Sequence, residues 1–374
     1  MKYLQSKLHA LVTLFQGVVS GRCFAGNAVL LACCDIVIAT DKSNIGLGGP
    51  VLAPISLETA EPCGDVLLTP CAQAMVQGAG LGSVPPDAIG PCNVQEKTGV
   101  IAVRVADEAQ AAEVARKCLH FFMLPQVSNW KPPAADVAAA LGSIIPVNRK
   151  LMYDIRAVIL GLCDEDSVLE LHKEHGCGVV TALVRVEGRA VGVIANNTMH
   201  LGGALDAESC EKAARFVRLC NARRLALLSL VDTPGYLVGP DAEVDGVLRR
   251  GVEFITAAAH ASVPIIAVVV RKAFGLGAMA MAGGSLHAPL LTLAWPMAEF
   301  GAMGLEGAVR LGMRSVLQNI SNEKEREDAV KAAVEELALR GRAVNVASLL
   351  EVDDVVEPEN TRARVASALR AAKL

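Results

Sequence analysis

Two kinds of hydrophobic pattern alternate along the first third of the chain. Mostly apolar runs rich in β-branched residues at 12–19, 35–39 and 100–105 are typical of buried strands. Apolar residues spaced at helical intervals predict helices at 27–33 and 107–119, and the second of these begins at the acidic pair Asp107-Glu108. Residues 1–7 are expected to belong to a helix that leads into the first strand. The irregular stretch 50–90 is expected to cover a site or a partner.

A segment rich in proline and polar residues separates this part from the remainder. It begins at Trp130-Lys131-Pro132-Pro133, continues to about Pro146 and is interpreted as a linker. Beyond it the pattern predicts a helix starting near 153–159, a hairpin of strands 179–186 and 190–195, strands at 226–232, 265–270 and 290–295, and helices at 209–220, 247–260 and 278–283. Strands that alternate with crossover helices predict a mainly parallel sheet and an α/β fold.

The clearest local signal is an apolar strand that breaks into glycines and resumes as a helix of small residues. It runs from Val268 to Gly284, with Gly275 and Gly277 at the break. Unpaired N–H groups and the helix dipole favour a negative oxygen at a helix N-terminus. A developing oxyanion would be stabilised at this junction.

A fainter copy of this junction lies near the start of the chain, at 18–28. Both copies pass from a β-branched strand through a basic residue, a Phe and a glycine into a helix rich in Ala, Leu and Met. A second glycine cluster follows each helix, at 45–49 and at 300–304. The chain is therefore interpreted as two related halves.

Composition narrows the possible classes of protein. With 374 residues, 52% of them hydrophobic and 20% charged, the chain can bury two cores. The net charge of -4 argues against nucleic acid as a partner. Eleven cysteines without C-x-x-C spacing or a secretory leader indicate reduced thiols in an intracellular compartment. The uncharged run 273–298 contains two prolines and is better explained by a buried helix and strand than by a membrane span.

Several motifs together resemble the carboxyltransferase (beta-type) subunit of biotin-dependent acyl-CoA carboxylases. They are LVDTPGYLVGP at 230–240, RRG at 249–251, RKAFGLGAMAMAGG at 271–284, AWPMAE at 294–299 and MGLEGAV at 303–309. The resemblance runs from about Gly21 to Ala366. It implies two crotonase-like (ClpP/crotonase) domains, of which the first, 1–130, is truncated. The second spans 151–374, after a linker at 131–150.

The resemblance also implies substrates, partners and site residues. An acyl-CoA thioester would bind the first domain, and carboxybiotin, carried on a separate chain, would bind the second. The biotin carboxylase and biotin carrier would be partner subunits of a homodimer or ring of dimers, in the cytoplasm or the mitochondrial matrix. Gly277 and Ala278, with Gly275 beside them, would cradle the biotin ureido oxygen, opposed by Gly235. The remaining implied site residues are Tyr236 and Leu276 at the biotin, and Ala25, Gly26 and Asn27 at the thioester oxygen.

The chemistry of such a transfer fits the residues that are present. Moving a carboxyl group from biotin to a thioester α-carbon requires stabilisation of an enolate oxygen and a ureido oxygen, and released biotin can accept the α-proton. Preorganised backbone donors can contribute about 3–4 kcal/mol each to such stabilisation. This requirement is consistent with a sequence that offers no convincing Ser/His/Asp set or carboxylate pair.

The sequence departs from the family in its first domain, which normally extends further ahead of Gly21 and completes the acyl-CoA pocket there. One alternative is therefore a catalytically incomplete paralogue that serves as a structural subunit, and another is a biotin-dependent decarboxylase component. Other interpretations stay open from the residues alone. They are a dinucleotide site at Gly275-x-Gly277-x-x-Ala280 with Glu299, hydratase acids at Glu299 and Glu306, a hydrolase using Ser285 and His287, and a metal site at His172, His175 and Cys177. Arg249-Arg250 is interpreted either as a contact to a phosphate or to the partner subunit, or as a solvated helix surface.

Overall fold

The computed structural model describes residues 14–48, 80, 85 and 88–372. The chain divides into two compact units, Met1–Cys118 and Leu119–Leu374, and each is described by itself. The expected helix at 1–7 and most of the insert at 50–90 lie outside the described residues.

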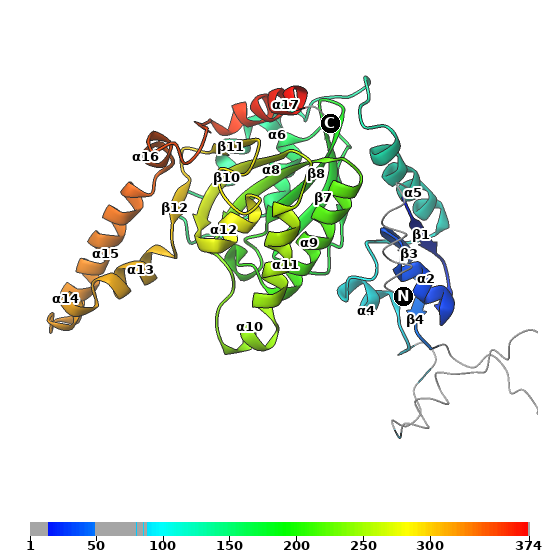
Figure 1. The fold of residues 1–374 in the computed structure, drawn as a ribbon, viewed down its shortest axis with the longest axis horizontal. Coiled ribbons are helices and arrows are strands. Elements are labelled where there is room, and N and C mark those ends of the chain that lie inside the picture. Colours follow the sequence, from blue (N-terminus) through cyan, green and yellow to red (C-terminus); the bar gives the residue numbers. More distant parts are fainter. Residues whose placement is uncertain (1–13, 49–79, 81–84, 86–87, 373–374) are drawn as a thin grey trace, which may run out of the picture. The chain divides into compact units, whose positions relative to one another are not determined.

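The second unit is built on an eight-stranded sheet (Figure 1), in the order β13-β11-β10-β9-β8-β7-β6, with β12 paired to the end of β10. The strands are β6 (Leu169–Leu171), β7 (Val179–Val186), β8 (Arg189–Asn196), β9 (Ala226–Thr233), β10 (Ile265–Phe274), β11 (Leu291–Ala294), β12 (Glu299–Gly301) and β13 (Asp354–Val355). β7 pairs antiparallel with β6 and β8, and β8, β9, β10, β11 and β13 pair parallel. The predicted hairpin and mainly parallel sheet are confirmed.

Helices cover both faces of this sheet because its strands are apolar on both sides. α8 (Ile155–Leu162) and α17 (Thr361–Ala371) pack on one face, where Trp295 is fully buried in the core. α9 (Ala207–Ala222) packs on the other face, and Gly192 of β8 leaves room there for Phe216 and Cys220. α11 (Val247–Ala259) lies against α9. The predicted strand–helix alternation thus forms three layers.

Residues 131–150, expected to be a linker, differ from that expectation. They contain two short helices, α6 (Ala135–Ala139) and α7 (Leu141–Ile144). Leu141 is 1% exposed and lies against Gly161 of α8, where a Cβ would be 2.6 Å from a Leu141 methyl. The proline-rich composition suggested a linker, although the segment supplies side chains to the core of the second unit.

The rest of the second unit consists of short helices and a helical arm. The arm is formed by α13 (Leu305–Gly312), α14 (Arg314–Gln318) and α15 (Glu323–Arg340), which pack on Phe274 through Leu305 and Val309. The other helices are η2 (Leu201–Gly203), α10 (Pro240–Val244), α12 (Gly275–Met281), α16 (Ala343–Ser348) and η3 (Pro358–Asn360). Across the described parts of the chain, every helix is too short or too polar to cross a bilayer.

The described part of the first unit has two small parallel sheets. β1 (Gln16–Val19), β3 (Ile36–Thr40) and β5 (Val103–Val105) form one in the order β1-β3-β5, and β2 (Arg22–Phe24) pairs with β4 (Asn44–Gly46) in the other. The helices are α2 (Gly26–Ala32), α4 (Cys92–Lys97) and α5 (Glu108–Met123), the last of which crosses the boundary between the units. Both predicted helices and all three predicted strands are present, with shifted ends.

The strand pairing confirms that the two glycine junctions are copies of one motif. In the first unit Val19 pairs with Ala39 and Phe24 with Gly46. In the second unit Val269 pairs with Ala294 and Phe274 with Gly301. In both copies the chain changes strand partner between the two pairs, and a seven-residue helix follows the Phe. The same register in two places is the structural signature of an internal repeat.

Candidate active site

Gly275 forms the turn between β10 and α12. The helix begins directly after Phe274, three residues earlier than the sequence pattern predicts. Gly275 has φ +60°, and a Cβ there would lie 2.9 Å from the carbonyl oxygen of Ala302, so both backbone conformation and space favour glycine. The first-turn amides of a helix lie outside its hydrogen-bond ladder. Here those amides belong to Gly275, Leu276 and Gly277.

Gly277 lies against the turn that follows β9. A Cβ on Gly277 would be 2.8 Å from both the Cα and the carbonyl carbon of Gly235, and 3.1 Å from the amide nitrogen of Tyr236. Gly235 has φ +118°. The structure thus brings together two glycines that the family resemblance places on opposite sides of one site. Packing within the chain requires Gly277 to lack a side chain, and Ala278 beside it is 2% exposed.

The Gly235 peptide is already hydrogen-bonded on both sides. Its N–H donates to Thr233 Oγ1 at 3.1 Å, and its carbonyl oxygen accepts from the Leu205 N–H at 3.0 Å. Gly235 therefore presents carbon surface rather than a donor. The N–H groups that can donate to a ligand at this contact therefore belong to the first turn of α12.

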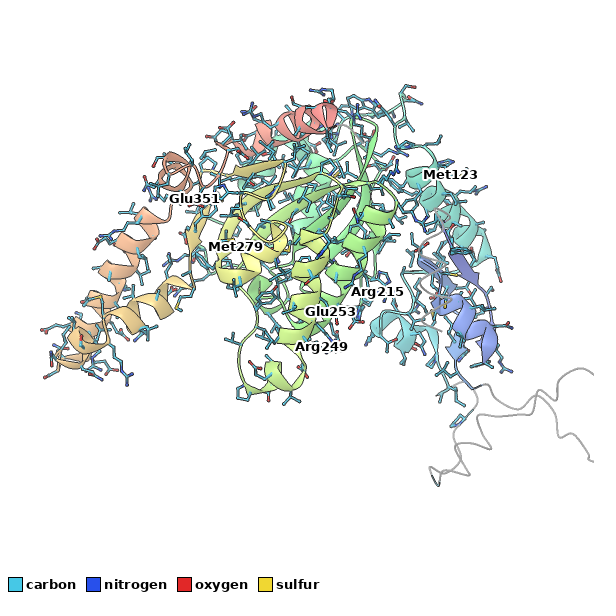
Figure 2. All side chains as sticks on the ribbon, in the orientation of Figure 1. Met123, Arg215, Arg249, Glu253, Met279 and Glu351 are labelled. Atoms are coloured by element: carbon cyan, nitrogen blue, oxygen red, sulfur yellow. The ribbon has the colours of Figure 1, made fainter. Side chains whose placement is uncertain are left out.

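Tyr236 and Leu276 adjoin the glycine contact in different ways. The Tyr236 hydroxyl donates to the carbonyl oxygen of Gly251 in α11 at 3.3 Å, and its ring packs where Gly251 leaves space. Burial raises the pKa of Tyr236, so its phenol stays neutral and is unsuited to act as an acid or base near pH 7. Leu276 is 69% exposed and presents an apolar side chain at the surface. Met279, labelled in Figure 2, lies further along the same helix.

Sequence reasoning missed an ionic cluster beneath this contact. Asp232 is fully buried at the end of β9, and its Oδ2 accepts from Arg271 Nε at 2.9 Å and from the Tyr153 hydroxyl at 2.8 Å. Burial lowers the pKa of Lys272, which is also close to Asp232, and raises that of Tyr153. The available signal was two apolar strands that end in opposite charges, because parallel strands meet at their carboxyl ends.

The first unit holds the counterpart of the glycine turn. Ala25, at the position equivalent to Gly275, has φ 54° and ψ -127°, and its N–H donates to Gly46 O at 3.1 Å. A positive φ stores strain in a residue with a Cβ. Ala25, Gly26 and Asn27 are all exposed, and a Cβ on Gly26 would meet no atom within 4 Å. Packing in the described structure therefore gives no reason for glycine at position 26.

Local partners account for most of the alternative candidates. Glu299 lies 3.5 Å from Arg149, and Glu306 lies 3.6 Å from the same guanidinium, so both carboxylates are paired rather than poised as hydratase acids. The His287 ring pairs with Glu351 at 3.2 Å instead of with Ser285. This arrangement gives no support to a Ser–His nucleophile pair.

The remaining alternatives are the metal and phosphate sites. The described residues contain no group of three His, Cys, Asp or Glu side chains able to hold a metal ion, which removes support for the site at His172, His175 and Cys177. Arg249 pairs with Glu253 along α11 at 3.1 Å (Figure 2), and Arg250 pairs with Glu211 at 3.2 Å. These pairs fit the interpretation of 249–250 as a helix surface.

A family model for the carboxyl transferase domain matches residues 4–373. The chain belongs to the carboxyl transferase domain family. This membership places the Gly235–Gly277 contact in a family of carboxyl-transferring proteins and leaves a dinucleotide site without support.

The chain matches parts of two longer relatives. The chain is 33% identical over 361 residues to the methylmalonyl-CoA carboxyltransferase 12S subunit of Propionibacterium freudenreichii subsp. shermanii, covering 94% of this chain and 63% of that protein. It is 37% identical over 291 residues to the propionyl-CoA carboxylase beta chain of Saccharopolyspora erythraea, covering 74% and 53%. The chain thus spans between about half and two thirds of these relatives.

Solved structures of the family have the same fold. A single-chain, multi-domain long-chain acyl-CoA carboxylase matches with a TM-score of 0.83 at 42% identity, covering 97% of this chain and 33% of that one. Transcarboxylase 12S, described as a hexamer with methylmalonyl-CoA and methylmalonic acid bound, matches with a TM-score of 0.81 at 29% identity, covering 99% and 67%. The predicted α/β fold is therefore that of the carboxyltransferases.

Proposed function

We propose that this chain is the carboxyltransferase of a biotin-dependent acyl-CoA carboxylase, and that it moves a carboxyl group from carboxybiotin to the α-carbon of an acyl-CoA. The observation that carries the proposal is the main-chain contact between Gly277 and Gly235 at the N-terminus of α12. This contact combines first-turn amides that have no hydrogen-bond partner within the helix with a surface free of side chains. The chain also belongs to a carboxyl-transferring family.

The chain's part in the reaction is electrostatic and positional. Carboxybiotin supplies the activated carboxyl group. The amide of Gly277, with that of Gly275 beside it, faces a ureido oxygen that becomes negative as the carboxyl group leaves, and the buried Ala278 follows them in α12. Rigid donors in a site with little water stabilise such charge by about 3–4 kcal/mol each. Gly235 contributes a wall of carbon, and Tyr236 and Leu276 flank the ring.

We assign the acyl-CoA to the first unit. The amide of Gly26, flanked by Ala25 and Asn27, would donate to the thioester oxygen as the α-carbon becomes an enolate. Two observations support this assignment. The turn repeats the strand register of the second unit, and Gly26 is exposed with open space where a Cβ would be. In this scheme both units are crotonase-like domains: the first stabilises the enolate oxygen of the thioester and the second the ureido oxygen of biotin.

The finer details follow the same proposal. The acyl group is acetyl, propionyl or longer. Biotin arrives on a separate carrier chain, with a biotin carboxylase as the other partner, and the chain assembles as a homodimer or a ring of dimers. The names of the relatives, which include propionyl-CoA and methylmalonyl-CoA proteins, support a short-chain substrate, while the long-chain acyl-CoA carboxylase supports a longer one. We place the protein in the cytoplasm or the mitochondrial matrix.

A catalytically incomplete, structural subunit is the second candidate. The described strands of the first unit match only β10, β11, β12 and β13 of the second, and no counterpart of β6 to β9 is seen within 14–48 and 88–118. Such a unit could hold a partner without a finished acyl-CoA pocket.

Reverse transfer from malonyl-CoA, methylmalonyl-CoA or a longer analogue to free biotin distinguishes the two candidates. Loss of the carboxyl group from any of these would support the carboxyltransferase and name its acyl class. A folded, assembled chain without turnover would favour the structural subunit.

A further inference from the structure

The Asp232 carboxylate accepts three hydrogen bonds and makes one longer ion pair at the carboxyl end of β9. Its Oδ2 accepts from Arg271 Nε at 2.9 Å and from the Tyr153 hydroxyl at 2.8 Å. Its Oδ1 accepts from the Lys272 N–H at 3.2 Å and lies 3.8 Å from Lys272 Nζ. Asp232 N–H in turn donates to Asn196 Oδ1 at 3.1 Å. The side chain has no exposure to solvent, so each of these bonds is formed away from competing water.

The donors belong to the segments that carry the two glycines in contact. Arg271 and Lys272 precede the Gly275 turn, and Asp232 precedes Gly235 by three residues. The ladder between β9 and β10 shifts register between Val269 and Ala273, beside these side chains. Regular strand pairing is therefore interrupted just where the glycines must be placed, and the carboxylate bridges the interruption.

The segment before α8 and the turn at Gly202 also contact this cluster. Arg271 Nη1 donates to Leu151 O at 2.8 Å, and its guanidinium stacks on the Tyr153 ring at 4.8 Å. Lys272 Nζ donates to Gly202 O at 3.0 Å, and Gly203 lies so close to Asp232 that a Cβ would be 2.4 Å from its carbonyl oxygen. The ends of β8, β9 and β10 are thereby tied to the segment before α8.

We propose that Asp232 is a positioning residue for carboxyl transfer, which fixes the ends of β9 and β10 so that the Gly235 and Gly277 main chains meet. Its carboxylate does not touch substrate. This inference rests on the proposed function for its kinetic consequence but not for its structural one. Donors stabilise a developing charge only where they are already in place, and a displacement of about 1 Å can lower a rate about 100-fold.

Asp164 offers a matched control. It is also a buried carboxylate of the second unit, 4% exposed, and it accepts from the Gly188 N–H at 2.7 Å, from the Glu187 N–H at 3.0 Å and from Arg362 at 2.5 Å. Because Glu187 and Gly188 form the hairpin that precedes β8, Asp164 lies near the amino end of β8, whereas Asp232 lies at the carboxyl end of the parallel strand β9. Asp164→Asn and Asp232→Asn should therefore lower the stability of the protein by comparable amounts while disturbing opposite ends of the strands.

The experiment compares the full chain, Asp232→Asn, Asp164→Asn and the milder Tyr153→Phe by hydrogen exchange and by reverse carboxyl transfer. In Asp232→Asn we expect exchange in peptides covering 233–239 and 274–282 to quicken about tenfold. We expect kcat to fall about 10- to 100-fold, with the KM for malonyl-CoA unchanged because the acyl-CoA is assigned to the other unit. Asp164→Asn should change neither. Tyr153→Phe keeps the hydrogen bond between Arg271 and Asp232. It should therefore change the exchange rate and kcat in the same direction as Asp232→Asn, but by smaller amounts.

Unchanged exchange in both peptides of the Asp232 variant, or equal changes in the two Asn variants, would overturn the inference. If Asp232→Asn does not fold, Tyr153→Phe decides by the same criterion. If the wild-type chain shows no turnover, that result would count against the proposed function alone. Hydrogen exchange in the Asp232→Asn variant would still test whether Asp232 holds the two glycine segments in place.

Discussion

A Cβ on Gly277 would lie 2.8 Å from the Cα of Gly235, which is closer than two unbonded carbons can approach. The N-terminus of α12 and the turn after β9 are thus in main-chain contact, with no room for a side chain at position 277. Glycine at 277 therefore serves two purposes. It permits this packing, and it leaves the proposed oxyanion site free of side chains.

Gly277→Ala is expected to lower the free energy of unfolding by about 1–3 kcal/mol, because backbone atoms rather than a flexible side chain must give way. Urea denaturation followed by circular dichroism measures the change. Gly307→Ala is the matched control, since Gly307 lies in α13 and a Cβ there would meet no atom within 4 Å. That variant should be more stable by about 0.5–1 kcal/mol. Equal effects at the two positions would contradict the packing argument.

Gly26→Ala should behave differently from Gly277→Ala. A Cβ at position 26 would meet no atom within 4 Å, and alanine favours the helix, so we expect stability to stay the same or rise by up to about 1 kcal/mol. If Gly26 approaches the thioester, reverse transfer should show a higher KM for malonyl-CoA or a lower kcat despite that gain. Unchanged kinetics would remove Gly26 from the proposed acyl-CoA site.

The elements that the sequence predicts well are those set by short-range pattern. The apolar runs ending at Val231 and Val270 become β9 and β10, and the glycine break becomes the start of α12. Even the faint copy near Phe24 proves to share its strand register with Phe274. The strands and the glycine break depend on residues within about ten positions of one another, where hydrophobic period and glycine content carry the information.

The features that escape prediction depend on distant partners. Tyr153 and Asp232 are 79 residues apart, and no local pattern relates them. β12 has three residues and pairs with the end of β10 that lies beyond the last residue paired with β11. The segment around Leu141 looks like a linker in composition but is buried. Tertiary packing overrides local propensity in each case.

Trp295→Phe tests the core on the α17 side of the sheet. The indole is fully buried, and its Nε1–H donates to Thr361 Oγ1 at 2.8 Å. Losing ring volume and this hydrogen bond should lower the free energy of unfolding by about 2–4 kcal/mol. Trp130→Phe serves as the control, because Trp130 is 38% exposed and its ring mainly stacks on Arg362. Denaturant titration should show a loss of about 1 kcal/mol or less for the control, and similar losses for both variants would contradict the assignment of Trp295 to the core.

Lys212 makes the stability of the second unit depend on pH. The residue is 3% exposed in α9, and desolvation by burial lowers its pKa from 10.5 to about 8. Between these two values the unfolded chain binds more protons than the folded chain, so this group makes stability rise with pH across that window. Below pH 8 the full cost of burying the charge is present.

Lys212→Met removes the buried charge at nearly constant length. At pH 7 we expect the variant to be more stable than wild type by about 3 kcal/mol, and the advantage should shrink from pH 8 towards pH 10. Buried thiols such as Cys163, whose pKa burial raises to about 12, have the opposite effect above pH 9, but they are common to both proteins and cancel in the difference. Lys173→Met, on an exposed position of the same unit, should change stability by less than about 0.5 kcal/mol at every pH. Urea titrations at pH 7, 8.5 and 9.5 measure the three proteins, and a difference between wild type and Lys212→Met that does not vary with pH would show that Lys212 stays protonated in the folded chain.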